Sequence, residues 1–235
     1  MSLNKYEKIN YLDKQGNTSL IIVKNKIDNQ TYLLKKINYK LLSQNEKQRA
    51  INEVKILSSL NHPNIIEMKE VFLDKPSSTL NLIMEFPNNG NLSNKIEYAK
   101  QKGMNLEESI IWDVLTQILL VINYLHKKGI IHRNLNSKNI FLSKSRLIKI
   151  TNFNCCYIID KNSNKFNKNG NSFYIAPEIL KEQNYNYKCD IWSIGCIIYE
   201  MASLSLPFIG KNNEILFNNI MTGKLNLYRN FIPKI

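Results

Sequence analysis

The chain has 235 residues, 43% of them hydrophobic, which is enough to bury a substantial core as one domain or as two small lobes. Its net charge of +13 raises the question of nucleic acid, but the lysines are scattered among many asparagines instead of gathering on one predicted face. We therefore expect no nucleic-acid binding, and an acidic protein surface fits the charge better. Residues 1–10 lack the apolar run of a signal peptide, so the expected location is cytoplasmic.

Two apolar segments, 110–125 and 191–206, look superficially like membrane spans. Asp113 and Gln117 interrupt the first and Glu200 interrupts the second, and both segments have the period of a helix. We expect buried helices and no membrane association. The four cysteines have neither metal-ligand spacing nor the pattern of a secreted disulfide framework, so we expect reduced packing residues.

The first part of the chain has the pattern of an antiparallel sheet with one helix. Residues 6–37 alternate apolar and polar over short runs, with a turn at Asp28-Asn29. Ser43 and Glu46 have the spacing of a capping box, which predicts a helix that extends to about Leu60. Two further strands are predicted at 65–72 and 80–86, separated by the turn-like residues 74–78.

Residues 87–90 break this pattern, and the rest of the chain is mainly helical. A long helix is predicted to begin at Asn105 with Glu108 in its first turn, and the segment 190–201 is apolar nearly all round, as in a central buried helix. A last helix at 212–222 is stopped by Gly223, and the polar residues 157–172 predict a loop. The expected fold class is α+β, with a small antiparallel β-sheet lobe at 6–86 and a larger, partial helical lobe at 87–235.

Two short motifs connect this architecture to known chemistry. Residues 132–139 read His-Arg-Asn-Leu-Asn-Ser-Lys-Asn, and residues 152–154 read Asn-Phe-Asn. Further matching positions occur in the expected order: Lys35, Glu53, Ala176-Pro177-Glu178 and Asp190-x-Trp192-Ser193-x-Gly195. Over nearly the whole chain, from about Tyr6, this set resembles the eukaryotic protein kinases. The segments 104–126, 132–150 and 185–208 look like NIMA-related serine/threonine kinases, although a relative of calcium-dependent kinases also fits the first lobe.

The resemblance implies a role for each matching position. Lys35 stands where the kinase lysine contacts the α- and β-phosphates of ATP, and Glu53 stands where a helix glutamate pairs with it. Asn134 occupies the position of the catalytic-base Asp, and Asn136 that of the Lys beside it. Asn139 matches one metal ligand, and Asn152 replaces the Asp that binds magnesium. An amide copies the shape of a carboxylate but carries no charge and accepts no proton near neutral pH.

The nucleotide positions depart from the family as well. The glycine-rich loop that lets the backbone approach the phosphates is replaced by residues 13–18, which keep one glycine at Gly16. In the expected adenine pocket, Leu33 replaces a small residue, and we expect it to pack with Leu20 and Leu142 in the adenine slot. At the hinge, marked by Glu85 and Pro87, the proline has no N–H to donate. We expect no cofactor, with ATP and magnesium binding at best weakly.

These substitutions predict a catalytically inactive kinase homologue that acts by binding a protein partner, such as an active kinase, as a scaffold or an allosteric regulator. Two alternatives stay open. One is a weak ATP-dependent serine/threonine kinase that uses Lys35, Glu53 and Asn139. The other is a truncated gene product, because kinase lobes normally continue with two more helices. In the activation segment, Asn171 and Asn167 replace expected hydroxyl residues. Ser163 and Ser172 have hydroxyls that can be phosphorylated, but exposed loop serines are usually only solvated, so no clear phosphorylation switch is expected.

Overall fold

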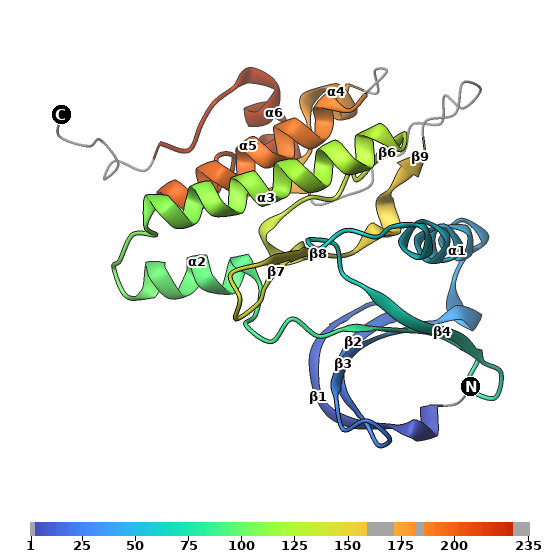
Figure 1. The fold of residues 1–235 in the computed structure, drawn as a ribbon. Helices are drawn as coiled ribbons and strands as arrows, with labels where there is room; N and C mark the ends of the chain where they lie inside the picture. Colours follow the sequence, from blue (N-terminus) through green and yellow to red (C-terminus); the bar gives the residue numbers. More distant parts are fainter. Residues whose placement is uncertain (1–2, 159–171, 182–185, 228–235) are drawn as a thin grey trace. The chain divides into compact units, whose positions relative to one another are not determined.

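The computed structural model describes residues 3–158, 172–181 and 186–227. The chain divides into two compact units, an N-terminal unit, Met1–Asn88, and a C-terminal unit, Asn89–Ile235. The fold class predicted from the sequence is confirmed, since one unit is built on an antiparallel sheet and the other is mainly helical (Figure 1).

The N-terminal unit contains a five-stranded antiparallel sheet with the strand order β1-β2-β3-β5-β4. The strands are β1 (Tyr6–Gln15), β2 (Thr18–Asn25), β3 (Thr31–Asn38), β4 (Met68–Asp74) and β5 (Thr79–Glu85). The short 3-10 turns η1 (Leu3–Lys5) and η2 (Tyr39–Leu41) flank them. Strand β4 begins three residues later than predicted.

Helix α1 (Gln44–Ser59) begins at the predicted cap. The Ser43 side chain accepts a hydrogen bond from the Glu46 backbone N–H, and the Glu46 carboxylate accepts one from the Ser43 N–H in return. Ala50 of α1 packs against Ile37 and Leu82 on one face of the sheet. Because successive strand residues point to opposite faces, Leu34 lies in a separate cluster on the other face.

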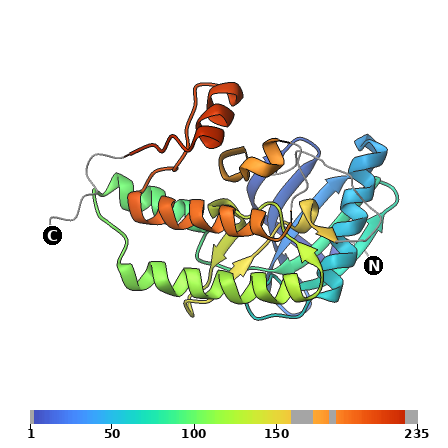
Figure 2. The same cartoon turned by 90° about the horizontal axis from the view of Figure 1, so that it is seen from above.

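The C-terminal unit consists of five helices and two small sheets among its described residues. The helices are α2 (Leu92–Gln101), α3 (Glu108–Lys127), α4 (Pro177–Leu180), α5 (Lys188–Ser203) and α6 (Asn213–Thr222). Strands β6 (Ile130–Ile131) and β9 (Tyr157–Ile158) form one pair, and β7 (Ile140–Leu142) and β8 (Ile148–Ile150) form the other. The 3-10 turns are η3 (Ser137–Asn139), η4 (Phe153–Cys155) and η5 (Ser172–Tyr174). Helices α3 and α5 lie side by side (Figures 1 and 2).

Three helix starts show how caps determine the boundaries. Helix α2 was not predicted as a separate element, although Asn91 and Asn94 form a reciprocal capping box at its start. The predicted start of α3 at Asn105 is wrong, because its N-cap is Glu107. The start of α6 is confirmed, since the Asn212 side chain accepts a hydrogen bond from the Ile215 N–H, and Gly223 ends the helix with φ 68°.

Helix α5 differs from the expectation of a fully buried core helix. It is apolar nearly all round and buries most of its residues, but Ile191 is 49% exposed. In the segment predicted as a loop, Tyr157 and Ile158 form β9, and residues 159–171 lie outside the described part of the chain.

Among the described residues, α3 alone has the length and composition of a membrane-spanning helix. It buries a stripe of residues at three- and four-residue spacing, which is typical of a helix packed on a core. These residues are Val114, Ile118, Val121, Ile122 and Leu125. The absence of membrane association stays a prediction.

Candidate functional site

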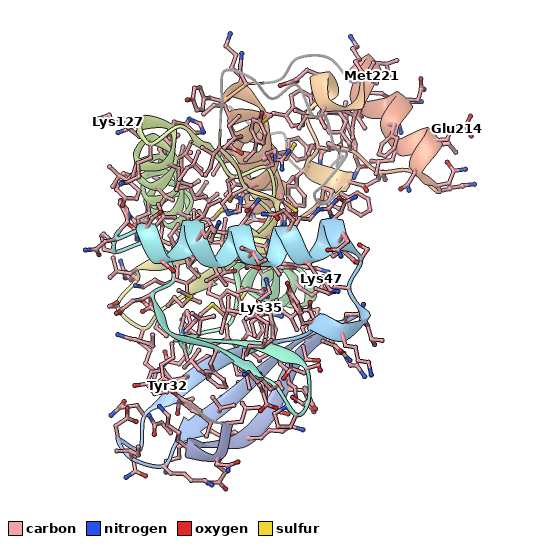
Figure 3. The ribbon with its side chains drawn as sticks, turned by 90° about the vertical axis from the view of Figure 1, so that its right-hand side faces the viewer. Tyr32, Lys35, Lys47, Lys127, Glu214 and Met221 are labelled. Carbon is pink, nitrogen blue, oxygen red and sulfur yellow. The ribbon has the colours of Figure 1, made fainter. Side chains whose placement is uncertain are left out.

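The N-terminal unit forms the ion pair that the sequence predicted. Lys35 lies on β3 and Glu53 on α1, and the lysine Nζ donates to the two carboxylate oxygens of Glu53 over 2.6 and 2.8 Å. Figure 3 shows Lys35 between the sheet and α1. Both residues are buried, with exposed fractions of 7% and 3%. The pair therefore ties the helix to the central strand and holds the ammonium group in one position.

The predicted adenine-pocket residues of this unit lie on the face of the sheet that carries Lys35. Leu20 lies opposite Lys35 in the β2–β3 register, and Leu33, which is 1% exposed, lies opposite Met84 of β5. Leu20 and Leu33 are therefore diagonal neighbours on one face. Leu142 belongs to the C-terminal unit, so its predicted packing against these two leucines stays a prediction.

The predicted hinge residues lie at the end of β5 and just after it. Glu85 ends the strand, and its backbone N–H donates to the Glu67 carbonyl over 3.0 Å while its side chain accepts from the Glu67 N–H over 2.8 Å. Pro87 is buried and offers no N–H. The residues at the positions of the glycine-rich loop form the β1–β2 connection, where Gly16 adopts φ 52° in the turn. The Asp13 carboxylate there accepts the N–H of Lys14.

In the C-terminal unit, Asp190 organises the segment that corresponds to the catalytic loop. Its side chain, on α5, is completely buried and accepts the backbone N–H groups of His132 (3.0 Å) and Arg133 (2.9 Å). The ring Nε2 of His126 lies 2.8 Å from the same carboxylate. Arg133 has a positive φ of 61°, a conformation that these bonds hold in place.

His132 links this loop to the Asn-Phe-Asn motif. Its ring lies 4.9 Å from the ring of Phe153, and both residues are buried. Burial lowers the pKa of His132, against the opposing charge of Asp190, so the ring is neutral at pH 7. Its Nδ1 atom accepts the N–H of Asn134 over 3.3 Å. Arg133 donates through Nε to the Cys155 carbonyl over 2.6 Å.

The four asparagines predicted at catalytic and metal positions form one connected network. Asn136 Nδ2 donates to the carbonyl (3.0 Å) and Oδ1 (3.2 Å) of Asn134, and Asn136 Oδ1 accepts two N–H groups of η3. Asn139 Nδ2 donates to the Asn134 carbonyl over 2.9 Å. Asn152, at φ 64°, donates through Nδ2 to Asn139 Oδ1 over 3.4 Å. The structure therefore brings these residues together, and their amides bond to one another.

This set of donors does not fit a magnesium ion. Magnesium in proteins is held by carboxylate and phosphate oxygens in octahedral geometry. Asn139 and Asn152 supply neutral amides, and the Asn139 oxygen already accepts the Asn152 amide. Across residues 3–158, 172–181 and 186–227, no group of three or more His, Cys, Asp or Glu side chains could hold a metal ion.

The sequence analysis missed a buried polar cluster beside the catalytic-loop segment. Ser137 Oγ lies 3.0 Å from the Tyr174 hydroxyl and donates to Glu200 over 3.1 Å, and Tyr174 also donates to Glu200. Burial raises the pKa of Glu200, although the bonds from Tyr174 and Ser137 oppose this effect. The available signal was Glu200 within the apolar segment 191–206, because a carboxylate in such a segment needs a buried partner.

Part of the predicted activation segment lies outside the described residues, including Asn167, Asn171 and Ser163. Ser172 begins the turn η5 and is half-buried.

Comparison with known proteins agrees with this arrangement of ion pair, buried aspartate and loop. The family described as "Protein kinase domain" matches residues 14–233. The chain belongs to the protein kinase family.

Its relatives place it with the NIMA-related kinases, as the sequence motifs predicted. The chain is 35% identical over 227 residues to "Probable serine/threonine-protein kinase nek2" of Dictyostelium discoideum, covering 95% of this chain and 54% of that protein. It is 35% identical over 205 residues to mouse Nek4 (87% and 26%) and 30% identical over 209 residues to human Nek2 (86% and 47%). The chain thus spans about half the length of these relatives, or less.

Protein kinases use ATP and magnesium for phosphoryl transfer. In this family member, the lysine–glutamate pair is present and buried, whereas the positions predicted for the base and the metal ligands hold amides.

Proposed function

We propose that this protein is a kinase homologue that does not transfer phosphate and acts by binding another protein, as a scaffold or an allosteric regulator. The observation that carries the proposal is the amide network, in which Asn134 and Asn152 stand where the reaction needs two carboxylates.

The base position argues against phosphoryl transfer. Asn134 is buried with an exposed fraction of 9%, and its backbone and side-chain oxygens accept hydrogen bonds from Asn136. An amide oxygen takes no proton from a substrate hydroxyl near pH 7. Loss of a positioned general base costs about 10²- to 10⁴-fold in rate.

The residue at the metal position also argues against phosphoryl transfer. The charge of a magnesium ion bridging the β- and γ-phosphates offsets the charge that develops during transfer. Asn152 supplies no negative charge to hold such an ion, and its Nδ2 points to Asn139. Rotating either amide by half a turn would exchange nitrogen and oxygen but would still leave a neutral ligand.

The framework of the fold is intact, which supports a role that depends on shape. Asp190 still binds two backbone N–H groups of the catalytic-loop segment, and Lys35 still bonds to Glu53. The proposed partner is a protein such as an active kinase, and the proposed location is the cytoplasm. ATP and magnesium are proposed to bind weakly or not at all.

A second candidate, a weak ATP-dependent serine/threonine kinase, is favoured by the buried Lys35–Glu53 pair. The pair positions an ammonium group for nucleotide phosphates in active kinases, and the named relatives are serine/threonine kinases. The pair also joins β3 to α1, so a structural role alone is enough to account for it.

Two measurements on the purified chain separate the candidates. The proposal predicts no clear change in melting temperature with ATP and magnesium, and no transfer of the γ-phosphate to a generic protein substrate. Magnesium-dependent transfer that disappears in the Lys35→Ala variant would establish the second candidate. Capture of a protein from native extract, followed by reconstitution with the purified partner, tests the binding role.

A further inference from the structure

The outer face of α3 exposes large apolar side chains. Trp112 is 58% exposed, Leu119 is 42% exposed and Leu120 is 52% exposed. The opposite face of the same helix is buried beside α5. The outer face also carries the exposed polar residues Asp113, Thr116 and Asn123, so α3 is amphipathic and large apolar side chains interrupt its polar face.

Trp112 and Leu119 form one row along the helix, whereas Leu120 lies about 100° around the helix from Leu119. Trp112 and Leu119 are seven residues apart, which is close to two turns, so their side chains lie in one row. Glu108 Oε1 accepts the indole N–H of Trp112 over 2.9 Å and holds the ring against the first turn. Thr116 and Asn123 are exposed and smaller, and they fall in the same row.

The β7–β8 turn lies beside a different side of α3. Gln117 of α3 donates to the Arg146 carbonyl over 3.1 Å and accepts the N–H of Ile148 over 2.9 Å. Gln117 is about 160° around the helix from Leu119, so these bonds hold the turn, with its 40% exposed Leu147, away from the row of Trp112 and Leu119.

The charges at the two ends of α3 have opposite sign. Glu107 and Glu108 are exposed at the N-terminal end, and Lys127 and Lys128 are exposed at the C-terminal end. Figure 3 shows Lys127 at the end of the helix. An α3 helix from a second copy, running antiparallel, would bring the acidic end of each helix to the basic end of the other.

We propose that the outer face of α3 is the contact surface of a two-fold symmetric homodimer. A two-fold axis that crosses α3 between Gln117 and Ile118 places Glu108 opposite Lys127 of the second copy. The same axis places Trp112 opposite Asn123, where a small side chain leaves room for the ring. Each contact occurs twice, because a two-fold interface is self-complementary.

The charge pattern favours a second copy over other occupants of this face. A bilayer with anionic lipids attracts lysines but repels carboxylates such as Glu107 and Glu108. An acidic protein surface complements only the end of the helix that carries Lys127 and Lys128. A single helix face is small against the roughly 800 Å² per partner of a standard interface. The dimer is therefore weak and depends on concentration.

Sedimentation equilibrium over a wide concentration range, at low salt, tests the proposal on the whole chain. The unmodified chain is expected to dimerise, and Glu108→Lys and Lys127→Glu are each expected to weaken the dimer about tenfold or more, because each places like charges together at two sites. An equal mixture of the two variants is expected to restore the dimer, since every pair across the axis is then oppositely charged. Leu119→Glu is also expected to abolish it, whereas Leu73→Glu, at a 51% exposed leucine of β4, is the matched control.

The melting temperature of each variant shows whether it is folded. A chain that stays monomeric at every concentration overturns the proposal. A dimer that survives both single charge reversals also overturns it, because the contact then lies elsewhere. Binding to vesicles of phosphatidylcholine and phosphatidylserine that Leu119→Glu removes, without dimerisation, would assign the face to a membrane instead.

Discussion

Replacing Asp190 by Asn tests the buried hydrogen bonds that organise the catalytic-loop segment. The carboxylate accepts three donors: the N–H groups of His132 and Arg133, and Nε2 of His126. The Asn side chain has the same shape as Asp but only one acceptor oxygen. Its NH₂ group stands where the second carboxylate oxygen was and cannot accept the hydrogen bond of the donor that it faces. At least one buried N–H group therefore loses its partner.

The size of the effect follows from these bonds. A hydrogen bond to a charged group contributes about 1.5–3 kcal/mol, and an unsatisfied buried donor costs about 1–3 kcal/mol. We expect the free energy of unfolding to fall by about 3 kcal/mol. For a chain of this size, that loss lowers the melting temperature by roughly 6–12 °C.

Thermal and urea denaturation, followed by circular dichroism, measure the change. The matched control is Asp113→Asn, because Asp113 is exposed on α3 and its substitution leaves no buried group unpaired. The control is expected to shift the melting temperature by less than about 2 °C. Equal shifts for the two variants would refute the reasoning, since they would mean that the buried carboxylate contributes no more than a surface one.

Three further predictions concern other buried groups. Lys35→Met leaves Glu53 buried without a cation and should lower the free energy of unfolding by about 3–5 kcal/mol. Lys36→Met, at the neighbouring position on the other face of β3, should lower it much less. Equal losses for the two variants would contradict the structural role of the pair. Because burial raises the pKa of Glu200 above its ordinary value of 4.5, the folded state holds that proton more tightly, and stability is lost as the pH rises from 4.5 towards the raised pKa. Glu200→Gln should therefore gain stability relative to the unmodified chain between pH 4.5 and 7 in parallel melts, and a difference independent of pH would be evidence against a raised pKa. Asn134→Asp combined with Asn152→Asp should not restore phosphate transfer in a radiolabelled ATP assay, because the glycine loop and hinge remain altered; recovery would show that those changes matter little.

The elements predicted from the sequence were those with strong local signals. The capping box at Ser43 and the glycine after α6 predicted helix ends correctly, because both act through bonds within a few residues. The start of α3 was predicted wrongly at Asn105. The Met104 N–H bonds back to the Ala99 carbonyl at the end of α2, so the residues that follow belong to a connection and not to a helix.

The candidate site also contains residues that the sequence predicted and contacts that it did not predict. The motif spacing predicted the positions of Lys35, Glu53 and the four asparagines, since residue order in a family is visible in the sequence. The partners of Glu200 were not predicted, because Ser137 and Tyr174 are 63 and 26 residues away along the chain.

The sequence by itself determined the family and predicted that amides replace two carboxylates, because both depend on residue identity at known spacing. Only the tertiary structure decided that the asparagine amides bond to one another and that Ser137 and Tyr174 bond to Glu200. The three- and four-residue spacing of apolar residues in α3 predicts its buried face, and Val114, Ile118, Ile122 and Leu125 are buried as this spacing predicts. Only packing in the folded chain decided how far the other residues are covered, because the neighbours of a helix come from distant parts of the sequence, and it left Trp112 and Leu119 on the surface.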